Sequence, residues 1–297
     1  MTRVVEPPEA PLRLAYSNLA CPEWSFERCV EAVGEYGFDG LEVRLFDGEV
    51  VSAGLSEASR RRADACLRES GVPVAALDTS LTVTTEDRGR FLAELEDLAG
   101  LAERWGAPLL RLFGGRLPAS SPAREEALEA AAALLRSAAA VAERHRVRLA
   151  VETHDDFSSA YTLAELLDRA GGVAGAVYDS HHPHRMGESP ADVLAALGPR
   201  VWHVQVKDAR RRPAPPSAPA EGATDPAAGL GQDEWELVDL GQGEVPVRVL
   251  LGLLKATGYR GWVSLEYEKK WHPELAAPEE ALPRQRQRLA EWLQALP

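Results

Sequence analysis

The sequence predicts a single (β/α)₈ TIM barrel, and three observations carry this prediction. Short apolar runs alternate with longer amphipathic stretches eight times along the chain, a pattern typical of parallel βαβ connections. The length of 297 residues suits eight such units. The first turn, SNLACP, lacks the G-x-G-x-x-G phosphate loop of a doubly wound open sheet, which is the main alternative fold. We therefore expect one domain over residues 1–297.

The predicted strands are short runs rich in valine, leucine and alanine. In chain order they span 12–17, 40–46, 72–78, 107–113, 147–152, 175–179, 201–208 and 261–268. The seventh, VWHVQVKD, differs from the others because His203, Gln205 and Lys207 alternate with its valines. Burying an amide without partners costs roughly 1–3 kcal/mol, so this strand either has dedicated partners for its polar groups or faces a site.

Each predicted strand is followed by a predicted helix with recognisable end signals. Gly37 closes the first helix, Ser56 begins the second, and Ser121-Pro122 forms the cap and first turn of the fourth. The helices are expected from the Trp24-Ser25 turn to Gly37 and near 56–70, 87–105, 122–145, 162–170, 190–197, 246–257 and 279–295. A Pro/Ala/Gly-rich stretch within about 209–239 predicts an irregular surface insertion.

Charge and composition count against several classes of function. The formal net charge of −13 disfavours nucleic-acid binding, which depends on Lys and Arg contacts to phosphate. The N-terminal stretch lacks an apolar signal core and no run is long enough to span a membrane, so no membrane partner is expected. Three scattered cysteines do not make a disulfide framework, which fits a cytoplasmic protein.

Polar residues stand at the ends of the last four predicted strands, where a barrel places its active site. They are Glu152, Asp179, Gln205 and Glu266, although Asp179 taken alone could equally be the N-cap of a helix. Carboxylates that converge on one barrel mouth repel each other unless a cation lies among them. A ligand set made only of oxygens favours Mg²⁺ or Mn²⁺ over Zn²⁺.

Four segments resemble the xylose isomerase-like barrel family, which includes sugar phosphate isomerases and epimerases, hydroxypyruvate isomerase, inosose dehydratase and endonuclease IV. The segment 19–44 resembles the family's first βαβ unit. The segment 175–190 is similar to its D-x-x-H strand, and HVQVKD (203–208) to its H-x-H-x-K-D strand. LGQGEVP (240–246) resembles the Gly-x-Gly turn before the seventh helix. The four segments occur in the family's order over nearly the whole chain.

The resemblance implies a metal held by Glu152, Asp179, Gln205 and Glu266. The family's strand-seven ligand is usually a histidine, and Gln205 departs from that pattern as in some hydroxypyruvate isomerase relatives. A glutamine carbonyl suits Mn²⁺ or Mg²⁺, leaves Co²⁺ as a further candidate and suits Zn²⁺ poorly. His182 falls where relatives bind a substrate hydroxyl, and His154 lies two residues beyond Glu152. Lys207 is a candidate to pair with a carboxylate or phosphate of the substrate, and Arg44 and Arg111 are further candidates for the same task.

The implied reaction is isomerisation or epimerisation of a small polyhydroxylated carbonyl substrate through an enediolate, with Glu152 and Glu266 as the two proton-transfer residues. A dehydratase of the inosose or dehydroshikimate type starts with the same proton abstraction and is the main alternative. A C-glycoside-cleaving lyase, a non-catalytic carbohydrate-binding barrel and an endonuclease IV-like zinc nuclease are further alternatives, and the acidic charge and Gln205 count against the last. The resemblance also allows a homodimer.

Overall fold

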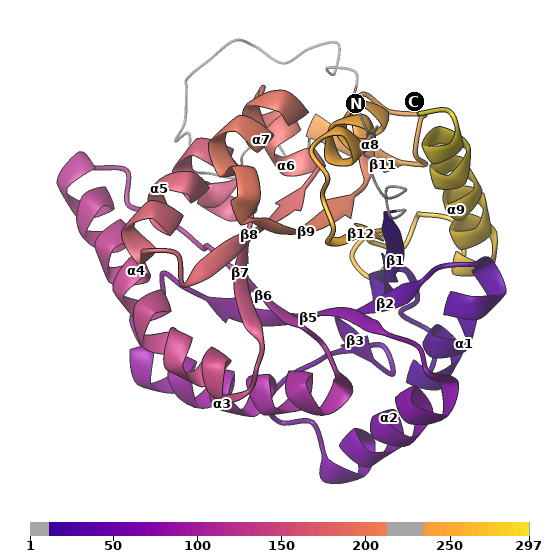
Figure 1. Ribbon diagram of the computed structural model, residues 1–297, viewed down its shortest axis with the longest axis horizontal. Coiled ribbons are helices and arrows are strands. Elements are labelled where there is room, and N and C mark those ends of the chain that lie inside the picture. Colours follow the sequence, from indigo (N-terminus) through magenta and orange to yellow (C-terminus); the bar gives the residue numbers. More distant parts are fainter. Residues whose placement is uncertain (1–11, 213–233, 297) are drawn as a thin grey trace, which may run out of the picture.

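The computed structural model describes residues 12–212 and 234–296, and eight parallel strands form a closed barrel at its centre (Figure 1). Around the barrel the strands follow the order β1-β12-β9-β8-β7-β6-β5-β2, and β1 closes the ring by pairing with both β12 and β2. The strands are β1 (Arg13–Ser17), β2 (Gly40–Val43), β5 (Val74–Thr82), β6 (Leu109–Phe113), β7 (Arg148–Glu152), β8 (Ala174–Asp179), β9 (Val201–Val206) and β12 (Trp262–Leu265). The predicted fold is confirmed, and the doubly wound alternative is wrong.

Helices surround the barrel as an outer ring (Figure 1). They are α1 (Phe26–Tyr36), α2 (Glu57–Ser70), α3 (Arg88–Trp105), α4 (Ser121–Arg144), α5 (Ala160–Ala170), α7 (Pro190–Leu197), α8 (Val247–Ala256) and α9 (Pro278–Gln294), with a short α6 (His181–Arg185) that the sequence did not predict. Gly37 ends α1 with φ of 75°, a left-handed conformation that glycine adopts without strain. In α4, Ser120 rather than Ser121 is the N-cap, so Ser121 already belongs to the first turn. Among the described residues, no helix is both long and apolar enough to cross a membrane.

Two short hairpins interrupt the predicted strands. The run 40–46 divides into β2 and the hairpin of β3 (Leu45–Phe46) with β4 (Glu49–Val50), because the Asn18 side-chain oxygen accepts the N–H groups of Arg44 and Leu45, each at 2.8 Å. The run 201–208 divides into β9 and β10 (Asp208–Arg211), which pairs antiparallel with β11 (Trp235–Val238). Both ends of the predicted irregular insertion 209–239 are therefore regular, and its middle, 213–233, lies outside the described residues.

Asp208 fastens the turn before α8 to the end of β9. Its carboxylate accepts the N–H groups of Gly241 at 2.8 Å and of Gly243 and Val245 at 3.0 Å. A Cβ at Gly243 would lie 2.2 Å from Asp208 Oδ1, so only glycine permits this close approach. The two segments that the sequence singled out separately, HVQVKD and LGQGEVP, thus form one structural unit.

Successive side chains of each strand point alternately to the surrounding helices and into the barrel. On β9, Val204 and Val206 belong to the main core against the helices, whereas His203 and Gln205 point inward and bond to side chains of other strands. This alternation accounts for the unusual pattern of VWHVQVKD. The polar face of the strand is the lining of the barrel.

Candidate active site

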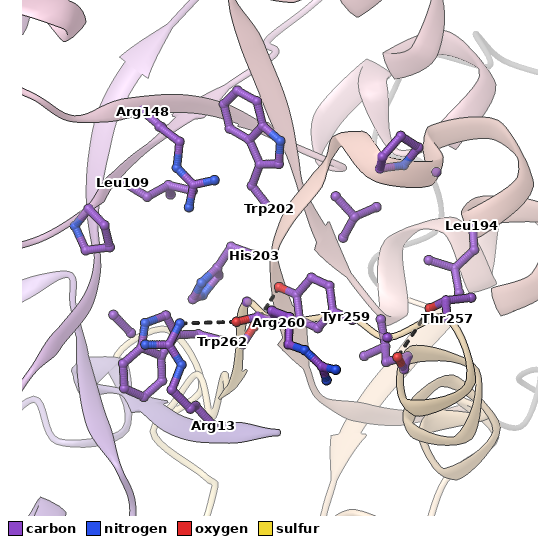
Figure 2. A pocket seen from close by; sticks show the side chains of 18 residues that line it. Arg13, Leu109, Arg148, Leu194, Trp202, His203, Thr257, Tyr259, Arg260 and Trp262 are labelled. Carbon is purple, nitrogen blue, oxygen red and sulfur yellow. Dashed lines mark hydrogen bonds between the residues drawn. The ribbon is translucent and has the colours of Figure 1, made fainter. Parts of the chain in front are cut away.

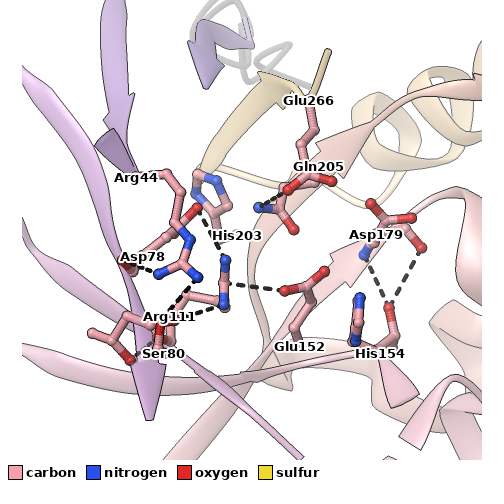
Figure 3. Close-up of polar contacts among 12 residues, drawn as sticks. Arg44, Asp78, Ser80, Arg111, Glu152, His154, Asp179, His203, Gln205 and Glu266 are labelled. Carbon is pink, nitrogen blue, oxygen red and sulfur yellow. Dashed lines mark hydrogen bonds and ion pairs between the residues drawn. The ribbon is translucent and has the colours of Figure 1, made fainter. Parts of the chain in front are cut away.

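Four side chains that the sequence selected as metal ligands meet at the C-terminal end of the barrel (Figure 3). Glu152 and Asp179 are the last residues of β7 and β8. Gln205 lies on β9, and Glu266 immediately follows β12. All four are buried, and one oxygen from each of the three carboxylates lies within 4.8 Å of the other two. These distances are short enough for one ion to contact all three acids.

Gln205 presents its carbonyl oxygen without a hydrogen-bond partner among the described residues. Its amide nitrogen donates to Glu42 Oε1 at 3.0 Å and to Glu266 Oε1 at 3.2 Å. The opposite amide orientation would set an oxygen against two carboxylates, so these contacts fix the orientation. The buried oxygen that remains, Oε1, is an unsatisfied acceptor of the kind that a cation binds.

Formal charge at this end of the barrel also leaves room for a cation. Besides histidines, and besides Asp208, whose carboxylate faces the backbone of the turn before α8, the buried charged groups inside the barrel and at its rim are Glu42, Arg44, Asp78, Arg111, Glu152, Asp179, Lys207 and Glu266. Five are carboxylates and three are cations, an excess of two negative charges. One divalent ion carries the opposite charge, so the donor set and the charge both fit such an ion.

Lys207 supplies the positive charge nearest to the carboxylates. Its ammonium lies 2.6 Å from Glu266 Oε2 and 3.0 Å from Asp179 Oδ2, and it also contacts Glu268. Burial raises the pKa of Glu266, but the neighbouring Lys207 outweighs burial and lowers this pKa to about 2. The sequence predicted that Lys207 would face a charged group of the substrate, whereas here it pairs with carboxylates of the protein.

Arg111 forms a buried ion pair with Glu152. Its Nε lies 3.1 Å from Glu152 Oε2, and its Nη1 donates to the carbonyl oxygen of Thr79 at 2.8 Å. Burial raises the pKa of Glu152, and the charge of Arg111 only partly offsets this effect. Arg44 donates to Asp78 O at 3.2 Å and to Ser80 Oγ at 3.0 Å. Both arginines, predicted as substrate contacts, are therefore engaged with the protein, although both also line the site opening.

The two oxygens of Asp179 have different partners. Oδ1 accepts the backbone N–H groups of His181 at 2.8 Å and His182 at 3.2 Å, at the start of α6. Oδ2 faces Lys207. The sequence left open whether Asp179 caps a helix or belongs to a site, and the geometry shows that the roles are compatible.

The two predicted substrate histidines, His154 and His182, lie together beside Glu152. The ring centroids of His154 and His182 are 4.6 Å apart, and each histidine brings a nitrogen within 4.8 Å of a Glu152 oxygen and of the other histidine. Burial, reinforced by Lys207, holds the pKa of His182 well below its ordinary value, so this ring is neutral. Its Nδ1 has no hydrogen-bond partner among the described residues and is available to a ligand.

Two buried carboxylates of the site were missed by sequence reasoning. Glu42 on β2 contacts both Gln205 and His203, and Asp78 on β5 lies 3.7 Å from Arg111. Each is an acidic residue at an inward position of an apolar strand, in GLEVR and AALDTS. The same signal had drawn attention to Gln205, so it could have identified both.

A small opening leads from solvent to these groups. Its volume is about 70 Å³, and the aromatic side chains of Phe113 and Trp271 stand beside Leu19 and His154 at its edge. Trp271 is 51 % exposed. A small pocket that is also lined by carboxylates, arginines and a lysine suits a small hydrophilic ligand.

The sequence matches one protein family and two named relatives. Residues 30–295 match a family model described as xylose isomerase-like TIM barrel. A Streptomyces coelicolor protein named hydroxypyruvate isomerase is 27 % identical over 202 residues, which are 64 % of this chain and 63 % of that protein's length. An inosose isomerase of Bacillus licheniformis is 23 % identical over 280 residues, 90 % of each chain.

Solved structures with the same fold include one with a bound metal. The crystal structure of the IOLI protein with a zinc atom is 18 % identical, covers 95 % of this chain and 98 % of its own, and superposes with a TM-score of 0.74. Epimerases and a dehydratase are among the other proteins that share the fold. Proteins of this fold therefore catalyse more than one reaction.

Proposed function

Because the chain belongs to the xylose isomerase-like TIM barrel family, we propose that it is a metal-dependent isomerase or epimerase of a small polyhydroxylated carbonyl compound. The observation that carries the proposal is the unpartnered Gln205 carbonyl oxygen beside three carboxylates that lie within 4.8 Å of one another. Structural roles alone do not account for a buried acceptor left unsatisfied at a site that is already rich in negative charge.

The residues that would hold the ion are Glu152, Asp179, Gln205 and Glu266. Their oxygen donors favour Mn²⁺ or Mg²⁺. Such an ion, when bound, stabilises negative charge that develops on the substrate's carbonyl oxygen and so acidifies the neighbouring C–H bond.

Proton transfer falls to Glu152 and Glu266. One carboxylate removes the proton from the carbon next to the carbonyl group, leaving an enediolate. The other returns a proton to the adjacent carbon, which gives isomerisation, or to the opposite face of the same carbon, which gives epimerisation. Lys207 keeps Glu266 ionised through their 2.6 Å contact, and Arg111 holds Glu152 in place. His182, neutral and with a free ring nitrogen, would hydrogen-bond a substrate hydroxyl.

The first experiment is a measurement of bound metal after purification with Mn²⁺, Mg²⁺ and Zn²⁺ supplied in separate preparations. We expect about one ion per chain in the wild type and a large loss in Glu266→Gln. Glu274→Gln is the matched control, because Glu274 follows the same strand but its side chain is 65 % exposed and outside the site. Thermal unfolding of both variants verifies the fold. An equal metal content in the two variants would refute the metal site.

The reaction class is then determined in deuterated water. Ketoses and cyclitols are incubated with the metal-loaded protein and analysed by mass spectrometry. An isomeric product that carries one solvent deuteron supports isomerisation or epimerisation. A product lighter by one water identifies the dehydratase alternative, which begins with the same proton abstraction.

A further inference from the structure

A second cavity lies at the opposite, N-terminal end of the barrel (Figure 2). Its volume is about 740 Å³, within the range of small-molecule sites. Residues that begin strands line it, among them Arg13 of β1, Arg148 of β7, Val201 of β9 and Trp262 of β12. None of the proposed metal ligands or proton-transfer residues reaches it, so the cavity is separate from the candidate active site.

Aromatic rings form its walls, and glycines make room for them. A Cβ at Gly175 would lie 2.2 Å from the Trp202 ring, and one at Gly40 would lie 2.7 Å from the Trp262 ring. Any other residue at these positions would displace the rings. The sequence thus accommodates two indoles at the end of the barrel that does not hold the candidate catalytic groups.

Positive charge surrounds these rings without balancing negative charge. Arg13 lies 4.3 Å over the Trp262 ring and Arg148 lies 5.0 Å over the Trp202 ring. Neither they nor Arg260 makes an ion pair within the described parts of the chain, and no Asp or Glu lines the cavity. This absence is unexpected in a chain with 46 acidic and 33 basic residues, in which most described arginines at the surface pair with a carboxylate.

We propose that this cavity binds a planar aromatic anion, a ring that carries a carboxylate or phosphate group. The ring would pack against the edges of the Trp202 and Trp262 indoles, and the anionic group would receive N–H bonds from Arg148 and Arg13, which lie over those rings. An arginine has five N–H donors, and the one contact described for Arg13 to a hydrogen-bond acceptor goes to the Arg260 carbonyl oxygen at 3.2 Å. Stacking on an indole leaves the in-plane N–H groups of a guanidinium free for the anion.

The test is isothermal titration calorimetry of the full chain, in EDTA, with 2-naphthoate and its neutral analogue 2-naphthamide. We expect 2-naphthoate to bind about tenfold more tightly than the amide, the effect of one charge-assisted hydrogen bond. Arg148→Gln should reduce this preference, because only Arg13 then remains to bind the carboxylate. Arg146→Gln is the matched control: Arg146 lies two positions away, is 85 % exposed and pairs with Glu103. Trp202→Leu should weaken the binding of both probes.

Three results would overturn the proposal. They are the absence of saturable 2-naphthoate binding up to about 5 mM, equal affinities for the acid and the amide, and equal affinities in Arg148→Gln and Arg146→Gln. The titration is repeated with Glu266→Gln, in which we expect unchanged binding, because Glu266 does not line this cavity. Loss of binding in that variant would place the probe in the candidate active site instead. Since the titration uses no metal and no turnover, its outcome is independent of the proposed enzyme activity.

Discussion

The two ends of this barrel are built from the same eight strands but carry opposite kinds of side chain. At the C-terminal end, Asp179, Gln205 and Glu266 are buried beside Lys207 with an excess of negative charge. At the N-terminal end, indole rings surround a cavity together with arginines that form no ion pair with any described carboxylate. Buried ionised groups cost stability unless they are well paired, so the groups of the candidate active site are expected to lower the stability of the C-terminal end. Apolar packing near the second end has to compensate.

This contrast predicts that substitutions at the C-terminal end change activity more than stability. The largest effect is expected for Glu152→Gln, which keeps the size of the side chain but removes a proton acceptor. Loss of a general base typically lowers kcat by about 10² to 10⁴. Steady-state kinetics on the substrate found by deuterium exchange measure the loss, and Glu274→Gln is the control. Wild-type turnover in Glu152→Gln would show that the carboxylate is not a proton-transfer residue.

Near the N-terminal end of the barrel, we expect substitutions to change stability more than activity. Leu167 lies in the last turn of α5, just before β8 begins, and is 1 % exposed. Leu167→Ala should lower the free energy of unfolding by about 2–5 kcal/mol, because it leaves a cavity in the core. Urea denaturation measures this change. If kcat of the folded variant also fell more than a few fold, the separation between the two ends would not hold.

Glu42 tests how strictly the metal site depends on its supporting contacts. Glu42→Gln replaces the carboxylate that accepts from Gln205 at 3.0 Å with an amide that can donate as well as accept, so both orientations of the Gln205 amide become possible. We expect Mn²⁺ to bind about 10- to 100-fold more weakly, as is usual when a partner of a metal ligand is lost. A competition titration with a chelating indicator measures the affinity. Unchanged affinity would mean that Gln205 is not a ligand or that its orientation has another cause.

The smallest expected effect concerns His145, which ends α4 near the starts of the strands. Hydrogen bonds to Glu96 and Glu103 raise its pKa above the ordinary value of 6.5. The resulting stabilisation is full below about pH 6.5 and is lost as the pH rises through the folded-state pKa. His145→Gln should therefore lower stability by less than about 1 kcal/mol near pH 6 and by nothing near pH 9. Thermal scans at both values test the sign, and an equal loss at both would contradict it.

Sequence periodicity was sufficient for the barrel and for the positions of Glu152, Asp179, Gln205 and Glu266, because strand ends in a closed barrel converge on one rim. It was not sufficient for contacts between distant strands. The pairing of Glu42 with Gln205 joins residues 163 positions apart, and no local pattern records that distance in space.

Three local details were also beyond the sequence. The α6 helix is a single short turn that Asp179 stabilises through its side chain, which periodicity does not register. The hairpin β10–β11 closes across the stretch 213–233, where composition predicted irregularity throughout. The Lys207 ammonium meets Asp179 and Glu266 only because their strands are neighbours of β9 in the barrel.

The β10–β11 hairpin is a suitable place to insert a foreign peptide into this protein. Its register runs from Asp208 with Val238 to Arg211 with Trp235, and the Arg212 N–H donates to Glu234 O at 2.7 Å. Because these bonds already hold both ends together, lengthening the segment between them adds only a slowly growing entropic cost. A reporter peptide or an affinity tag inserted between 212 and 234 should therefore leave the strand that carries Gln205 in register. The engineer gains an attachment point beside the rim of the barrel without rebuilding it.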